Sequence, residues 1–303
     1  MADDVIIVGV DAAWQRSHAL AWGVNEALLR ERPLRAIHVV EEPKRYSDTY
    51  APVRADGVSI VPVRIEKAAT RVVDEVRPYL AGIDTKLDFG VDLRVGKPDD
   101  VLVELTETAT MLVLGRRGHG VFSELLIGST SDALGNRGRG PVVVVPSGWQ
   151  EQDQEHRAGP VLVGVDWLEP ESSEPAVEFA ADHAGAHGVQ LTFVLVWDFP
   201  WAVASDQPVS TEEIDQWHDM ADARGAELVE DWRSKRPGVE IDHLVRQGQA
   251  VEGLLAAAED LNPQLLAVGG RLRSRVGELL LGSVARGVLH HTTHPIAIVH
   301  QHP

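Results

Sequence analysis

The chain repeats itself, and this internal repeat limits its possible folds more than any other feature. Two apolar runs each end at an aspartate, VIIVGVD in the first half and VLVGVD in the second. Farther along, LVLGRRGHGVFSELLIGST matches LAVGGRLRSRVGELLLGSV, and each half closes on a proline-led apolar run. The equivalent positions, offset by 154 or 155, are Asp11 and Asp166, Gly115 and Gly269, Gly128 and Gly282, and Ser129 and Ser283. This ordered series indicates duplication of a unit of about 145 residues.

The length agrees with a duplication. A chain of 303 residues, at roughly 150 residues per domain, is expected to form about two domains. The segment from Pro146 to Gly159 is polar and lacks hydrophobic periodicity, which is typical of a linker. We therefore predict a first domain over 1–146, a linker over 147–159 and a second domain over 160–303.

Strand-like and helix-like segments alternate in both halves. Short apolar runs without polar alternation predict strands that are covered on both faces. In the first half the pattern predicts strands at 5–10, 34–40, 87–95, 111–114 and 141–145, with helices at 19–30, 60–80 and 98–108. In the second half it predicts strands at 161–165, 192–197, 265–268 and 296–299. This alternation predicts an α/β fold of two open parallel sheets, because parallel neighbours need a helix-length crossover.

Composition excludes several classes of function. The chain has 28 Lys and Arg against 46 Asp and Glu, a formal net charge of −18, so nucleic acid is not an expected partner. It has no cysteine, which removes disulfides, thiolate metal sites and cysteine nucleophiles. The acidic start lacks the features of a secretion signal, and no apolar run approaches the ~20 residues that span a bilayer. We expect a soluble, cytoplasmic protein without a membrane partner.

A glycine-rich segment follows the fourth predicted strand. Glycines at 115, 118 and 120 can bring backbone N–H groups close to a ligand and permit positive φ. Ser129 and Thr130 stand at an expected helix start, where free N–H groups and the helix dipole attract phosphate. Arg116 and Arg117 add positive charge of unknown direction. No GxxxxGK[ST] and no GxGxxG after the first strand is present, and a few glycines can also form a simple tight turn.

The spacing Gly115, Gly118, then nine residues to Gly128 and Ser129 resembles the GxxGx(9)G[ST] nucleotide loop of the universal stress protein family. The opening VIIVGVDAAWQRSHALAWGVNEAL, the IHVV strand and the closing GPVVVVP strand are similar to that family as well. The resemblance covers most of 1–146 and, more weakly, 160–300. It implies Rossmann-like domains with five-stranded parallel sheets flanked by helices. It also implies ATP, with or without Mg²⁺, at the switch point between the first and fourth strands.

The resemblance assigns particular residues to this adenine-nucleotide site. In the first domain they are Asp11, Val39, Gly115, Gly118, His119, Gly128, Ser129 and Thr130. Asp11 would face the ribose and adenine, and the backbone of Val39 would lie near the adenine. Two alternatives stay open: an aspartate after a strand often caps the next turn, and His119 can be an ordinary exposed loop histidine. Ala12 and Ala13 depart from the small glycine and serine usual in the family.

The second domain departs further from the pattern. Its corresponding residues are Asp166, Val196, Gly269, Gly282 and Ser283, but Leu272 stands where the second glycine belongs. A bulky residue at positive φ costs roughly 1–2 kcal/mol, about tenfold in affinity, so a weaker or altered site is expected. Gly270 could shift the turn, and Arg271, Arg273 and Arg275 could supply cations.

Other residue patterns predict neither a metal site nor a catalytic serine. His183 with His187, and His290 with His294, have the i, i+4 spacing of metal ligands on a helix. No third ligand accompanies either pair in the sequence, so a metal site is not predicted. Ser129 lacks a GxSxG elbow, and no catalytic residue is assigned.

We therefore predict an ATP-binding regulatory protein with little or no turnover. A slow ATPase or nucleotidyl-transfer enzyme on the same scaffold, and an interaction module with empty sites, remain as alternatives. The apolar closing strands are exposed-edge candidates that invite pairing. In the family the last strand commonly mediates dimer contacts, so an internal pseudo-dimer is expected, and a homodimer is possible.

Overall fold

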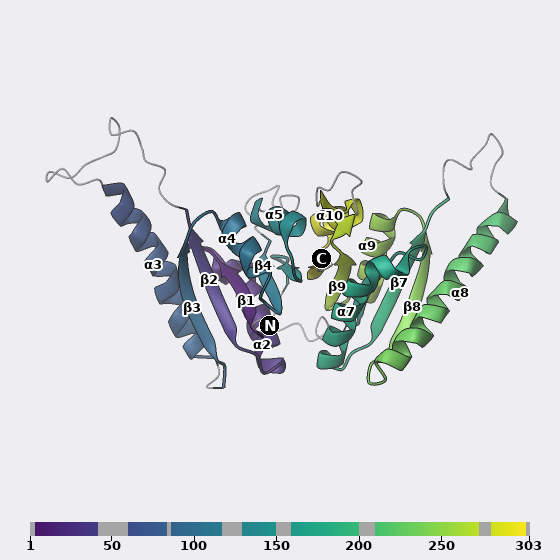
Figure 1. The fold of residues 1–303 in the computed structure, drawn as a ribbon, viewed down its shortest axis with the longest axis horizontal. Helices are drawn as coiled ribbons and strands as arrows, with labels where there is room; N and C mark the ends of the chain where they lie inside the picture. Colours follow the sequence, from purple (N-terminus) through teal and green to yellow (C-terminus); the bar gives the residue numbers. More distant parts are fainter. Residues whose placement is uncertain are drawn as a thin grey trace, which may run out of the picture.

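The computed structural model describes residues 4–41, 60–83, 86–116, 129–149, 159–199, 210–272 and 280–300. For residues 60–69, 129, 271–272 and 280 it describes the backbone alone. Within these ranges the chain forms two α/β halves whose sheets join along one strand pair, and the long helices α3 and α8 lie at the two outer ends (Figure 1).

The first half alternates strands and helices as its sequence predicts. Its elements are β1 (Ile6–Val10), α1 (Trp14–Ser17), α2 (Ala19–Leu29), β2 (Leu34–Val40), α3 (Ile60–Ala81), β3 (Phe89–Val95), α4 (Pro98–Leu105), β4 (Met111–Gly115), α5 (Ser129–Arg137) and β5 (Val142–Val145). Helix α4 begins at Pro98, whose missing N–H and fixed φ suit the first helical position.

The second half follows the same order. Its elements are β6 (Val161–Val165), a 3₁₀ helix (Pro170–Ser173), α7 (Glu174–His187), β7 (Leu191–Trp197), α8 (Thr211–Lys235), β8 (Ile241–Gln247), α9 (Ala250–Leu261), β9 (Leu265–Gly269), β10 (Arg271–Leu272), β11 (Leu280–Leu281), α10 (Ser283–His291) and β12 (Ile296–Val299). A capping box between Ser210 and Glu213 starts α8, and Gly188 in the left-handed conformation ends α7.

Ten of the described strands form one sheet in the order β3-β2-β1-β4-β5-β12-β9-β6-β7-β8, and β10 and β11 pair separately. Within each half of this large sheet all neighbours are parallel, which confirms the predicted fold class of two five-stranded parallel sheets. The two sheets join where β5 pairs antiparallel with β12. We call this boundary between the two halves, with the helices that meet across it, the seam. The equivalent residues Val143 and Ala297 lie directly opposite each other there. A pseudo-twofold axis therefore passes between them, and the expected internal pseudo-dimer is present in the described strands.

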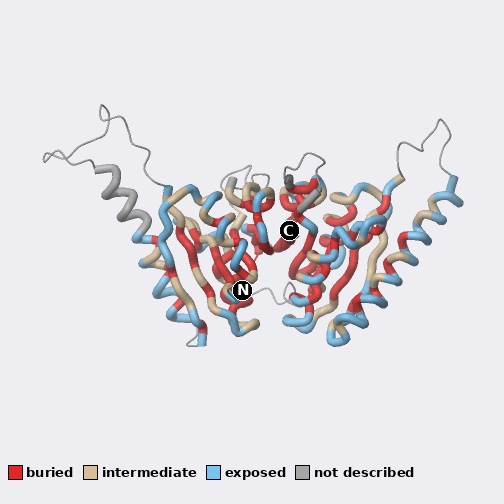
Figure 2. Tube along the Cα trace, viewed as in Figure 1, coloured by how far each residue is buried: buried red, intermediate tan, exposed pale blue. Residues whose placement is uncertain are grey.

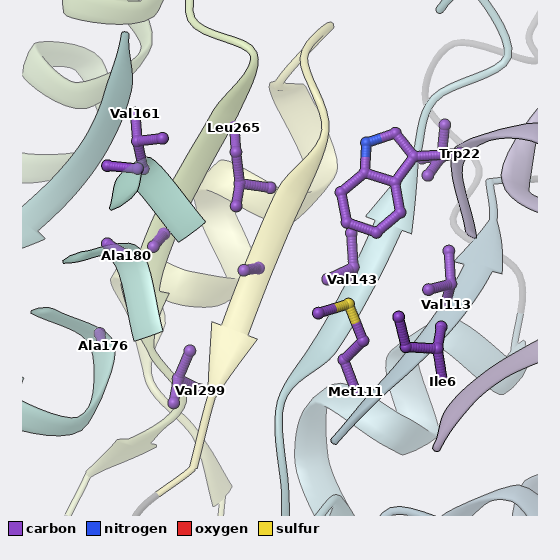
Figure 3. Close-up of a cluster of buried hydrophobic side chains, with 14 of the residues drawn as sticks. Ile6, Trp22, Met111, Val113, Val143, Val161, Ala176, Ala180, Leu265 and Val299 are labelled. Atoms are coloured by element: carbon purple, nitrogen blue, oxygen red, sulfur yellow. The ribbon is translucent and has the colours of Figure 1, made fainter. Parts of the chain in front are cut away.

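Two apolar cores lie on opposite faces of the sheet, because alternate strand residues point to opposite sides. Ile6, Val8 and Val10 of β1 belong to one core, with residues of α2, α3, α7 and α8. Ile7 belongs to the other, with residues of α4, α5, α9 and α10. Buried positions follow both sheets up to the seam (Figure 2), and Figure 3 shows the first core with Trp22 and Val143 on one side of the seam and Val161 and Leu265 on the other.

Some elements differ from the sequence expectations. The apolar runs gave no signal for β8, whose exposed face carries polar residues, and the short α1 and the 3₁₀ helix were not predicted. His290 and His294 do not share a helix, because α10 ends at His291, and His294 instead bonds Asn262 Oδ1 at 3.1 Å. The domain boundaries stay a prediction, and most of the linker lies outside the described residues. None of the described helices combines the length and the apolar character that crossing a membrane requires.

Candidate functional site

A cavity opens at the carboxyl ends of β1 and β4. The chain runs from β1 outward to β2 and β3, then returns to place β4 on the other side of β1, so the strand order reverses between β1 and β4. Ligands of open α/β sheets bind at such switch points. The residues that line the cavity are Gly9, Val10, Asp11, Ala13, Arg16, Ser17, Ile37, Val39, Pro98, Leu102, Leu114, Gly115, Arg116, Thr130, Ser131 and Ser147.

Asp11 ends β1 and forms the turn into α1. Its Oδ1 accepts a hydrogen bond from the N–H of Ala13 at 2.8 Å, so the carboxylate caps this turn as one alternative from the sequence anticipated. The same half-buried carboxylate also lines the cavity. The turn and a ligand role are therefore compatible, since a carboxylate offers about four lone-pair sites.

Glycine is needed at position 115 because Ser17 packs closely against it, and not because the backbone has positive φ. The sequence allowed positive φ there, yet Gly115 is not among the described glycines that have it, which are Gly96, Gly188 and Gly248. A Cβ at Gly115 would instead overlap the Cβ of Ser17 and lie 3.2 Å from its carbonyl oxygen. The absent side chain therefore lets α1 pack directly on the end of β4, which closes one side of the cavity.

Helix α5 begins beside the cavity and directs its first turn toward it. Thr130 and the buried Ser131, both in that turn, line the cavity. The backbone of Ser129 starts the helix, as its sequence predicts, and unpaired amides at such a start favour an anion. Gly118, His119 and Gly128 lie outside the described residues, as does Arg117.

Arg116 directs its guanidinium into the other half of the molecule. Its Nη1 donates to the carbonyl oxygens of Thr292 at 2.9 Å and of Leu289 and His290 at 3.4 Å. These carbonyls close the C-terminal end of α10, where a cation is favourable. The sequence suggested Arg116 as a cation near a phosphate. Its guanidinium instead lies at the end of α10, across the seam.

The second half places its predicted residues at equivalent strand ends with different contacts. Asp166 is exposed, and its Oδ1 accepts from the N–H groups of Leu168 and Glu169 at 3.0 and 3.2 Å. Gly269 ends β9, the neighbour of β6, and a Cβ there would have only an ordinary contact at 3.7 Å. Val196 packs on α9, where a Cβ at Gly253 would lie 2.8 Å from both of its methyl groups.

The described ends of the second glycine-loop segment pair with each other. Leu272 was expected to be strained at positive φ, but it lies in the extended strand β10, which pairs antiparallel with β11. That expectation of strain is wrong, because an extended strand accepts a leucine readily. Gly282, before α10, donates its N–H to the carbonyl of Gly270 at 3.2 Å, and Ser283 begins α10 as an exposed residue.

Sequence reasoning missed several residues of the cavity wall. They come from α1, from α4 and from the second residue after the closing strand: Arg16, Ser17, Pro98, Leu102 and Ser147. One signal was available, because Pro98 marks a helix start directly after the third predicted strand and hence at the same edge of the sheet. Nothing in the sequence indicated that Ser17 would pack on Gly115.

Comparison with known proteins shows which family this chain belongs to. The model of the universal stress protein family matches residues 4–146 and again 158–300, so it covers both halves. The chain belongs to the universal stress protein family. This match confirms the sequence resemblance and the tandem arrangement. The universal stress protein Rv2005c of Mycobacterium tuberculosis is 30% identical over 303 residues, covering 98% of this chain and 97% of that protein.

Other universal stress proteins share the whole length as well. Rv2623 of M. tuberculosis is 27% identical over 311 residues, covering 98% of this chain and 96% of that protein. A crystal structure of a universal stress protein from Archaeoglobus fulgidus superposes with a TM-score of 0.70 at 17% identity, covering 99% of both chains. At that identity the likeness shows the tandem fold, and the chemistry of this cavity has to be argued from its own residues.

Proposed function

We propose that the first half of this universal stress protein binds an adenine nucleotide, ATP with or without Mg²⁺, and acts as a nucleotide-dependent switch in a stress response. The observation that carries the proposal is the cavity at the β1/β4 switch point, which Asp11, Gly115 and the first turn of α5 line together. The glycine spacing that continues from Gly115 to Ser129 supports it.

The cavity offers different surroundings for the parts of a nucleotide. Ile37, Val39 and Leu102 supply apolar wall beside the ends of β1 and β2, which suits a base. Asp11 can accept hydrogen bonds from ribose hydroxyls. The start of α5, with the hydroxyls of Thr130 and Ser131, suits phosphates, because backbone amides and the helix dipole favour negative charge there.

The proposal includes little or no turnover. Among the described residues that line the cavity, Asp11 is the sole carboxylate, and no histidine or lysine accompanies it. Phosphoryl transfer to water normally uses a metal and a group that positions the attacking water. A carboxylate already engaged in a turn is poorly suited to both tasks, so binding rather than hydrolysis fits these residues better.

An ATP titration of the full chain by calorimetry tests the proposal. We expect one strong site per chain, and Asp11→Asn should weaken it by about tenfold, since a hydrogen bond to a charged group contributes roughly 1.5–3 kcal/mol. The asparagine oxygen can still accept from Ala13, so the turn is kept. Asp166→Asn is the matched control and should leave the strong site unchanged.

Two further measurements separate the alternatives. Mass spectrometry of gently purified protein should find a co-purified adenine nucleotide, and its absence together with no heat of ATP binding would support the module with empty sites. A phosphate-release assay with Mg²⁺ should detect little turnover. Sustained release that Asp11→Asn abolishes would instead establish an ATPase and contradict the switch.

A further inference from the structure

A second cluster of polar side chains lies at the seam between the halves, away from the nucleotide cavity. Glu26 on α2 and His183 on α7 are each 1% exposed, and His187 lies one turn beyond His183. His187 Nε2 is 2.6 Å from Glu26 Oε1, and His183 Nδ1 is 3.5 Å from Glu26 Oε2. The three donor atoms lie within 4.8 Å of one another. The third ligand that the histidine pair lacked in the sequence thus comes from the other repeat.

We propose that Glu26, His183 and His187 form a binding site for one divalent transition-metal ion, such as Zn²⁺, shared between the two repeats. Two histidines at i, i+4 on one helix plus one carboxylate are a common zinc ligand set. Three donors at about 2.1 Å from one ion stand about 3.4 Å apart, so the present spacing needs side-chain adjustment only.

The protonation states of the cluster suit a metal ion, which binds carboxylates and neutral imidazoles. Burial lowers the pKa of His183 to about 3, despite the opposing effect of Glu26, so its ring is neutral at pH 7. Burial raises the pKa of Glu26, but the hydrogen bond with His187 and the charge of Arg30 oppose it, and that pKa lies below its usual value of 4.5. The carboxylate is therefore ionised.

Arg30 occupies the position that a metal cation would take. Its Nε donates to Glu26 Oε2 at 2.8 Å, and its Nη2 donates to His183 Nδ1 at 3.2 Å. The Arg30 side chain is 15% exposed, so part of it reaches the surface. In this arrangement Arg30 and the metal ion compete for the same two donor atoms.

A cavity beside the cluster provides access and room for a further ligand. Its lining residues are Trp22, Asn25, Glu26, Leu29, Trp149, His187 and Gln264. Gln264 is 7% exposed, and its Nε2 has no hydrogen-bond partner among the described residues. A water molecule on the fourth coordination position of the metal would give this buried amide an acceptor.

The experiment is a zinc titration of the full chain in metal-free buffer, followed by calorimetry and, with Co²⁺, by visible absorption. We expect one ion per chain. Glu26→Gln and His187→Ala should each weaken binding by about tenfold or more, whereas Arg30→Gln should tighten it, because the competing cation is removed. His243→Gln, which removes an imidazole from the distant pair with Asp222, is the matched control and should change nothing.

A measurement on the unaltered protein guards against variants that fail to fold. In ¹⁵N-histidine spectra, one equivalent of Zn²⁺ should shift the imidazole signals of His183 and His187 and leave the other eleven in place, out of 13 histidines. Shifts confined to other histidines, such as His302 near the C-terminus, would overturn the proposal. So would unchanged zinc affinity in a folded His183→Ala/His187→Ala double variant. The outcome is independent of ATP binding in the first half.

Discussion

The two repeats end equivalent strands with glycine, but the surroundings of these glycines differ. Gly115 lies against Ser17, where a Cβ would overlap the Ser17 side chain, whereas a Cβ at Gly269 would be 3.7 Å from its nearest neighbour, the Ser172 carbonyl oxygen. Asp11 accepts one turn amide and lines a cavity, and the exposed Asp166 accepts two. After duplication, the strand ends could diverge because each belongs to one half alone.

Residues at the seam are constrained differently from the strand ends, because each must fit a residue of the other half. Glu26 and His183 occupy equivalent positions, each eight residues before the strand that follows its helix. In a dimer of identical single domains, a twofold axis would bring the same residue type to both sides. A tandem chain can place a carboxylate on one side and two imidazoles on the other, so duplication permits this contact.

The largest expected effect concerns this seam and pH. Between pH 6.5 and 4.5 the unfolded chain protonates His183 while the folded chain does not, so stability falls as pH falls, by up to about 1.4 kcal/mol per unit. Below pH 4.5 the lowered pKa of Glu26 acts in the same direction. Urea unfolding at pH 8, 6.5, 5.5 and 4.5 measures this slope in metal-free buffer.

His183→Gln removes the titrating imidazole and should flatten the slope between pH 6.5 and 4.5. The difference in the free energy of unfolding between the variant and the wild type at pH 8 gives the cost of the lost contacts. The change from pH 6.5 to 4.5 is therefore measured from each protein's own value at pH 8. Glu26, His187 and Arg30 are the charged or titratable groups that face His183. A variant slope equal to that of the wild type would mean that His183 does not supply the acid sensitivity.

Substituting alanine for the two strand-end glycines, Gly115 and Gly269, should have effects of intermediate size on the free energy of unfolding. Gly115→Ala forces α1 away from the end of β4 and should lower the free energy of unfolding by about 1–3 kcal/mol, the usual cost of overpacking. Gly269→Ala should stay within about 0.5 kcal/mol of the wild type. Urea denaturation of both variants checks the pair, and equal losses would contradict the difference between the two strand ends.

The smallest effect concerns Arg116, whose equivalent in the second half is Gly270. Arg116→Ala removes the hydrogen bonds to three carbonyls at the end of α10 and should destabilise the chain by about 1–2 kcal/mol. Hydrogen exchange of the last turn of α10 should rise in this variant. Unchanged protection there would show that the cross-seam contact does not stabilise the helix end.

Much of the cavity at the β1/β4 switch point could be predicted from the sequence because its parts are local. Asp11, Val39, Gly115 and Thr130 all line the cavity, and each lies at the start or end of a segment whose type was readable from apolar runs and helix-start signals. The packing of Ser17 on Gly115 could not be read, since α1 is only four residues long. The direction of Arg116 was equally hidden, because its acceptors lie 173–176 residues away.

The sequence alone determined the duplication, the alternation of strands and helices and the parallel sheets, because these depend on residue order and hydrophobic periodicity within each repeat. The tertiary structure decided the register in which the two closing strands pair, where Arg116 points, that Leu272 is extended, and that Glu26 meets His183 and His187. The physical reason is distance along the chain. Glu26 and His187 are 161 residues apart and belong to different repeats, and the antiparallel pairing of β5 with β12 sets how the repeats meet.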